Sequence, residues 1–172
     1  MATLVDTDSL PARQLRAVLD ASESRLYRIT DAESAVHPRP GKWSPREIIG
    51  HLIDSASHNH QRFVSAAGMS DLVFSGYDQD GSVELQRYQQ VPWHELLGLW
   101  AAYNRHIARV MAAVPESVRS RVHARHNLDQ VAFQVEQAVA TPTLEFFMLD
   151  YVAHLEHHLR QVLGADWTTR QD

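Results

Sequence analysis

The sequence predicts an all-α protein, a four-helix bundle in which a long connection separates the second and third helices. Three observations lead to this prediction. Four long segments carry apolar side chains at three- and four-residue spacing, as amphipathic helices do. Residues that favour helix starts and ends flank them. One stretch, residues 68–91, lacks this periodicity at first. Amphipathic helices bury their apolar faces against one another, and we expect one domain over residues 1–172.

The first predicted helix runs from residue 9 to about residue 30, and its charged residues suit a solvated face. The second has a clearer start, because Ser44 and Glu47 form a capping box and Pro45 suits the first helical position. We expect it to reach about residue 67 and to bury Ile48, Ile49, Leu52, Ile53, Ala56, Phe63 and Val64. A second row on this helix is polar, and it either faces solvent or belongs to a site: His51, Ser55, His58 and Arg62.

Residues 68–91 have the features of a long loop that crosses one end of the bundle, with a short helix over residues 83–90. Residues 92–114 form the third long helix, and its broad apolar and aromatic face is typical of a core. Residues 116–140 show no periodicity. The sequence therefore assigns no role to the cationic side chains in that segment, Arg121, His123, Arg125 and His126.

The fourth helix is predicted between Thr141 and Gly164. Thr141 can cap its start, Pro142 suits its first position, and Gly164 suits the residue just past its end. Its buried stripe consists of apolar residues at helical spacing, Leu144, Met148, Val152, Leu155, Leu159 and Val162.

Of the three histidines on this helix, two share one inward-leaning face and the third does not. At about 100° per residue, His158 falls within the apolar stripe, His154 lies on its edge one turn earlier, and His157 points toward the polar side. Two imidazoles at i and i+4 can bind one metal ion, because they stack on one face. The chain has eleven histidines, so roughly 0.7 such pairs would arise by chance. A core histidine beside a surface one is the alternative interpretation.

The composition excludes several classes of function. The formal net charge is −5 and no basic run occurs, so nucleic acid and an anionic membrane are poor candidates for partners. No apolar run approaches the ~20 residues of a membrane span, and the N-terminus lacks signal-peptide features. The absence of cysteine excludes a disulfide framework, a thiolate metal site and a cysteine nucleophile. We expect a cytoplasmic protein in which imidazole or carboxylate holds any metal.

Several motifs together resemble the DinB/YfiT-like superfamily over about residues 10–164. They are Trp43-Ser44-Pro45-Arg46-Glu47-Ile48-Ile49-Gly50-His51-Leu52-Ile53-Asp54-Ser55, Gly76-Tyr77-Asp78-Gln79-Asp80, Trp100 with Tyr103-Asn104, and Asp150-Tyr151 followed by His154, His157-His158-Leu159 and Gln161. The two histidine motifs are the most specific part. The resemblance implies a four-helix bundle with one divalent metal, usually zinc or nickel, on one histidine of the second helix and two of the fourth. By position these are His51, His154 and His158.

The resemblance also implies an activity. Some members of the superfamily are described as metal-dependent hydrolases, and others are transferases or isomerases that use thiols such as bacillithiol. Many are dimers, so we expect a homodimer with a small-molecule substrate. Our first hypothesis is a transferase that joins a low-molecular-weight thiol cosubstrate of the bacillithiol type to a small electrophile through a metal-bound thiolate. The alternatives are a hydrolase that uses metal-bound water and a non-catalytic metal-binding bundle of a stress response.

Further polar residues are candidates for supporting roles at such a site. Asp54 could act as a base and Arg62 as an anion anchor. Asp150 and Gln161 lie on rows next to the paired histidines of the fourth helix and could orient their imidazoles. Each of the four could equally be an ordinary polar residue of a helix surface. Three imidazoles with open positions indicate a catalytic metal rather than a structural one, and they suit zinc, nickel, copper or iron.

Overall fold

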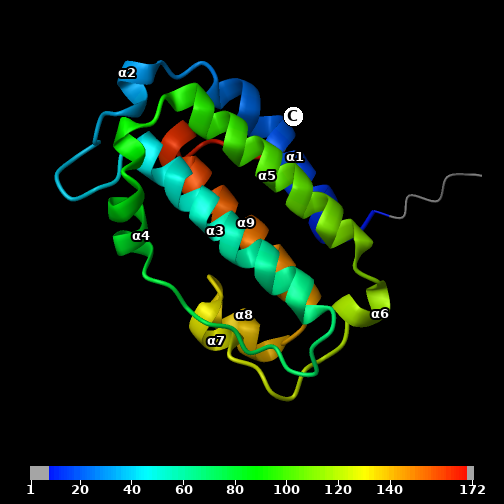
Figure 1. Cartoon of the computed structure of the whole chain (residues 1–172). Coiled ribbons are helices and arrows are strands. Elements are labelled where there is room, and N and C mark those ends of the chain that lie inside the picture. The colour runs from blue at the N-terminus through cyan, green and yellow to red at the C-terminus, as the bar shows by residue number, and fades with distance from the viewer. Residues whose placement is uncertain (1–7, 170–172) are drawn as a thin grey trace, which may run out of the picture.

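The computed structural model describes residues 8–169, so most of the N-terminal segment assessed for a signal peptide lies outside the described residues. Four long helices form a bundle (Figure 1): α1 (Leu10–Leu26), α3 (Pro45–Ala66), α5 (Trp93–Ala113) and α9 (Leu144–Leu163). Both α1 and α3 pack against α5 and α9. The first two long helices, α1 and α3, therefore occupy opposite corners of the bundle, and α3 lies beside α9. The predicted fold class is confirmed.

The connection between α3 and α5 contains α4 (Gln79–Gln86) and the 3-10 turn η1 (Tyr88–Gln90). The prediction of one short helix over residues 83–90 was therefore wrong in its bounds. Helix α4 starts earlier because the side chain of Asp78 accepts a hydrogen bond from the N–H of Gly81 at 3.0 Å. It ends where Arg87 adopts a left-handed conformation with φ of 51°.

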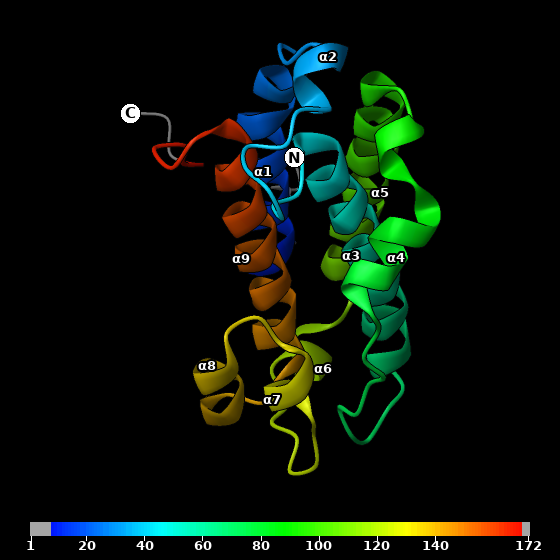
Figure 2. The same ribbon diagram turned by 90° about the vertical axis from the view of Figure 1, so that its left-hand side faces the viewer.

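Shorter helices fill the segments where the sequence pattern was weak. The first long helix ends at Leu26 rather than near residue 30, and α2 (Asp31–Ser34) follows with a capping box of its own. Residues 116–140 contain α6 (Glu116–Arg119), α7 (Leu128–Val131) and α8 (Val135–Ala140). Figure 2 shows these three short helices grouped at one end of the bundle, beside the start of α9.

Helix α9 begins at Leu144, and its N-cap is Thr143 rather than the predicted Thr141. The Thr143 hydroxyl accepts a hydrogen bond from the N–H of Phe146 at 3.0 Å. The preceding residues are held out of the helix because the carbonyl of Pro142 accepts the N–H of His123 at 3.0 Å. The other end agrees with the prediction, since Gly164 follows the last helical residue with φ of 107°.

The core between the long helices is apolar and rich in aromatic rings. Its largest fully buried side chains include Trp100, Trp167, Tyr151, Phe63 and Phe147. The ring of Phe63 meets the rings of Phe147 and Tyr151 edge to face, with centroids 5.9 Å apart in both pairs. Val64 was predicted to be buried but is 53% exposed. Within the described residues, no helix combines the length and apolarity that a membrane span requires.

Candidate metal centre

Helix α3 places the side chain of His51 in the interior of the bundle. The capping box at its start is complete, because Ser44 and Glu47 exchange hydrogen bonds as predicted. Two turns later the side chain of His51 is fully buried, and its ring lies 5.0 Å from that of Trp43. The Nδ1 atom of His51 has no hydrogen-bond partner within the described part of the chain. The polar contacts of this ring therefore concentrate on Nε2.

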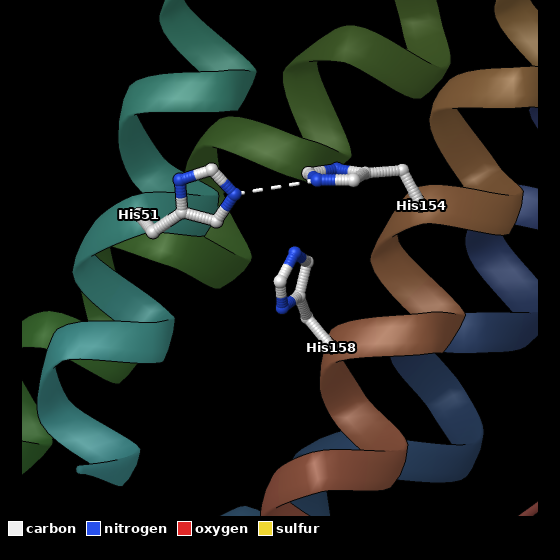
Figure 3. Close-up of side chains that lie close together, drawn as sticks. All are labelled: His51, His154 and His158. Carbon is white, nitrogen blue, oxygen red and sulfur yellow. Dashed lines mark hydrogen bonds between the residues drawn. The ribbon is translucent and has the colours of Figure 1, made fainter. Parts of the chain in front are cut away.

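Helix α9 places the other two imidazoles next to the ring of His51. Figure 3 shows His154 and His158, one turn apart on α9, pointing toward His51 on α3. The Nε2 atoms of His51 and His154 are 3.3 Å apart. The ring of His158 lies 4.8 Å from that of His51 and 4.6 Å from that of His154, measured between centroids. One nitrogen from each of the three lies within 4.8 Å of the other two.

This geometry fits a divalent metal ion. Two nitrogens that each lie 2.0–2.1 Å from a tetrahedral zinc ion are about 3.3 Å apart, which is the separation of the His51 and His154 Nε2 atoms. Metal binding also requires neutral imidazoles. Burial, together with the neighbouring imidazoles, lowers the pKa of His51 to about 4 and that of His154 to about 2. Burial also lowers the pKa of His158. All three rings are therefore neutral at neutral pH.

Gln161 lies beside the site as the sequence suggested. Its Oε1 atom is 3.0 Å from Nδ1 of His158, and its Nε2 atom is 3.1 Å from Nε2 of the exposed His157. An amide oxygen accepts hydrogen bonds, so Nδ1 of His158 carries the proton and its Nε2 is left as the electron-pair donor. The helical phase had separated His157 from the pair. Its exposed ring lies 5.1 Å from that of His158, measured between centroids, but it is not one of the three rings whose nitrogens converge.

Asp150 lies one turn before His154, but its contacts differ from the suggested role of orienting an imidazole. Its two carboxylate oxygens accept the backbone N–H groups of Phe133 and Gln134 at 2.8 and 2.7 Å. Through these bonds it holds the segment between α7 and α8 against the site. The ring of Phe133 consequently lies 5.6 Å from that of His154. Sequence analysis missed Phe133, because residues 116–140 carry no periodic pattern.

Asp54 binds the connection between α3 and α5. Its Oδ1 atom accepts hydrogen bonds from Nε2 of Gln86 and the hydroxyl of Tyr88, both at 2.6 Å. Burial, followed by this hydrogen bond, raises the pKa of Tyr88, so the phenol stays protonated and donates. Gly50 permits the close approach of Tyr88, since a Cβ atom there would lie 2.1 Å from its ring. These contacts identify Asp54 as an anchor of η1 on α3.

Two cavities meet at His158. The larger, of about 750 Å³, is lined by Arg39, Lys42, Trp43, Asp80 and Gln161 in addition to this histidine. The smaller, of about 360 Å³, is lined by side chains that include Ser55, Asn59, Arg62, Tyr77, His154 and His158. His158 is thus shared by both cavities, whereas His154 lines the smaller one only.

The remaining polar residues of interest divide between the smaller cavity and the loops. His58 stacks on Tyr77, which lines that cavity, with ring centroids 3.9 Å apart. His123 is buried and its Nδ1 lies 2.8 Å from the carbonyl oxygen of Ser70. His126 accepts a hydrogen bond from the N–H of Leu128 at 3.4 Å. His123 therefore joins two loop segments, whereas the contact of His126 is local to its own segment.

Comparisons with known proteins agree with this architecture. The DinB superfamily profile matches residues 14–162. A solved structure, YfiT from Bacillus subtilis, described as a probable metal-dependent hydrolase with an unusual four-helix bundle topology, is similar with a TM-score of 0.68 and 17% sequence identity. The alignment covers 94% of this chain and 87% of that one. A search of curated proteins finds no significant match. The chain belongs to the DinB superfamily.

Proposed function

We propose that the protein is a metal-dependent enzyme that acts on small molecules, and that His51, His154 and His158 hold one divalent ion, zinc or nickel. The observation that carries this proposal is the convergence of one nitrogen from each of these three side chains within 4.8 Å. Three protein ligands are typical of a catalytic metal, whereas structural zinc is normally closed by four. A divalent ion with open positions supplies Lewis acidity, which makes a water or a thiol more acidic.

We propose a thiol transferase in particular, for two reasons. A reaction between two small molecules needs room for both, and His158 lines two cavities. The protein has no cysteine, so the sulfur must come from a cosubstrate such as a bacillithiol-type thiol. In such a transfer the sulfur bonds to an electrophilic carbon, the thiol proton is released, and the displaced group departs with the bonding electrons.

The chain's own residues define what each cavity can do in this reaction. The larger cavity offers the cations Arg39 and Lys42 to the thiol cosubstrate. In the smaller one, burial and the nearby carboxylate of Asp54 raise the pKa of Tyr77 to about 12, so its hydroxyl remains a hydrogen-bond donor. The ring of Phe133 packs against that of His154 at the wall of the smaller cavity.

Hydrolysis is the second candidate, because the similar structure YfiT is described as a probable metal-dependent hydrolase. A hydrolase needs a general base beside the metal. Asp54, the base suggested by the sequence, has one oxygen occupied by Gln86 and Tyr88 and does not line either cavity at the imidazoles. These contacts favour the transferase. A bundle that binds metal without catalysis is the third possibility, and the experiment below separates all three.

The test uses purified protein loaded with zinc or nickel. We expect it to accelerate the consumption of bacillithiol by monochlorobimane, and we expect His154→Ala to abolish this activity while His94→Ala, on the exposed side of α5, retains it. Hydrolysis of activated esters without thiol would support the hydrolase instead. No activity in either assay, together with tight metal binding, would support the non-catalytic bundle. Light scattering on the same preparation tests the expected homodimer.

A further inference from the structure

Arg62 is a half-buried cation that faces the smaller cavity from α3. Its guanidinium donates hydrogen bonds to the carbonyl of Ser75 at 2.5 Å and to Oδ1 of Asn59 at 3.5 Å. Its central carbon lies 5.9 Å from the ring centres of both Phe74 and Phe147. A guanidinium has five N–H donors, and these neutral partners engage two of them. The remaining donors are available to a ligand.

The charge of Arg62 has no counter-ion within the described residues. Other arginines of the same chain form ion pairs, as Arg46 does with Asp31 and Arg119 with Glu145. No carboxylate of residues 8–169 lies within ion-pair distance of Arg62. Asp150 lines the same cavity, but both of its oxygens accept backbone N–H groups. A partly desolvated and unpaired cation is costly, so this cavity is complementary to an anion.

The position of Arg62 sets the shape of that anion. Its guanidinium lies over Phe147, and Phe147 precedes His154 by seven residues, which is about 10 Å of helix rise. The cavity therefore runs from a cationic end to an imidazole end, with aromatic side chains between them, among them Phe147 and Tyr151. A molecule that spans it carries its negative charge at one end and its reacting atom at the other.

We propose that the smaller cavity binds the electrophile of the reaction, and that this electrophile is a compact aromatic carboxylate that carries a displaceable group and is held by Arg62. The planar fork of a guanidinium matches the two oxygens of a carboxylate. A volume of about 360 Å³ admits a molecule of that size. The role of electrophile rests on the proposed transferase function, whereas the anion site itself does not.

The test measures binding, without turnover, in the metal-loaded protein. Phenylpropanoate and its neutral counterpart phenylpropanamide are titrated by calorimetry against wild type, Arg62→Gln and the control Arg109→Gln, which removes the same charge from the exposed surface of α5. We expect Arg62→Gln to weaken phenylpropanoate binding about tenfold or more. The same variant should change amide binding by less than about twofold, and Arg109→Gln should change neither. Arg62→Lys, which keeps the charge without the fork, should be intermediate.

Three results would overturn the proposal. The first is equal binding of acid and amide to wild type. The second is unchanged acid binding in a folded Arg62→Gln protein, or in Arg62→Lys if the glutamine variant does not fold. The third is phenylpropanoate binding that is lost when the metal is removed but is unchanged in the Arg62 variants, because the carboxylate would then bind at the imidazoles. Arg62→Gln could lose phenylpropanoate binding while the wild type transfers no thiol to any electrophile. That result would support the anion site and contradict the transferase function.

Discussion

The imidazole of His51 illustrates how burial sets the chemistry of a single residue. An isolated histidine is half protonated near pH 6.5, but full burial beside His158 lowers the pKa of His51 to about 4. The ring therefore keeps its electron pair at neutral pH, and no proton must leave before it can bind a cation. The same argument applies to His154, which burial and three neighbouring imidazoles keep neutral.

At this scale we predict that His154→Ala loses metal. Removing one of three ligands leaves only His51 and His158, which are too few for a stable zinc site. Metal analysis of purified protein should fall from near one ion per chain to a small fraction of that. His94→Ala, at an exposed position of α5, is the control, and it should retain the ion. Equal metal content in both variants would contradict the site.

A second prediction at the residue scale concerns pH and the metal-free protein. The pKa of His51 is 6.5 in an unfolded chain and about 4 when folded, so between these values the unfolded state binds a proton that the folded state does not. Stability is thus full above about pH 6.5 and falls as the pH drops toward 4, by about 1.4 kcal/mol per pH unit for each such histidine. His154 adds to this slope.

Urea unfolding of metal-free protein at pH 7 and pH 5 measures this effect. We expect a lower free energy of unfolding at pH 5, and a smaller difference in His51→Gln, which has no group to protonate at that position. Equal stability at the two pH values would mean that these imidazoles are not buried in the folded state.

At the scale of elements, Asp150 connects α9 to the segment between α7 and α8. Each oxygen of its carboxylate accepts one backbone N–H, from Phe133 and from Gln134. Charge-assisted hydrogen bonds of this kind are about twice as strong as neutral ones. The carboxylate is buried, and the segment that it holds carries Phe133 over His154. A helix of the bundle thereby positions a loop that has no core of its own.

We predict that Asp150→Asn loosens this segment. The asparagine side chain has one acceptor oxygen and a donor group in place of the other, so one of the two backbone N–H groups loses its partner. Hydrogen exchange followed by mass spectrometry should show the amides of Phe133 and Gln134 exchanging about tenfold faster. Asp129→Asn on the exposed surface of α7 is the control and should leave their exchange unchanged. Unaltered protection in Asp150→Asn would contradict the anchoring role.

The individual helices differ in how well the sequence pattern predicted their bounds. The second helix was predicted well because Ser44, Pro45 and Glu47 form a local signal that folding leaves intact. The start of the fourth was wrong because Thr141 and Thr143 can both cap a helix, and the choice depends on a hydrogen bond between Pro142 and His123, nineteen residues earlier in the chain. The segment around α7 and α8 was not predicted at all, since its position depends on Asp150 rather than on its own periodicity.

At the scale of the molecule, the order of helices around the bundle decides where a metal can act. Because α1 and α3 occupy opposite corners, α3 and α9 are neighbours, and the cluster of three imidazoles bridges them. An ion bound there joins helices that are separated by 103 positions between His51 and His154. Such an ion binds the folded state alone, because the unfolded chain does not bring the three rings together.

We therefore predict that metal raises the thermal stability of the whole molecule. Zinc or nickel at a free concentration of about one hundred times Kd should add about 2.7 kcal/mol. For a chain of this length that corresponds to a rise in Tm of roughly 5–10 °C. Differential scanning calorimetry with and without a chelator measures the change. In His154→Ala the same additions should have little effect, and an equal rise in that variant would show that the ion acts elsewhere.

The four long helices and the rows of side chains on each could be predicted from the sequence, because capping residues and apolar periodicity act over one or two turns. The sequence also singled out His154 and His158, since two positions on one helix have a fixed phase. Periodicity could not decide whether His51 was buried at a site or faced solvent, because its surroundings depend on which helices pack against α3. Three contacts depend on the packing of the whole bundle: Asp54 anchors η1, Phe133 packs against His154, and Arg62 faces a cavity with no counter-ion among residues 8–169. Those contacts join segments far apart in the chain, and only the packing of the whole bundle brings them within reach of each other.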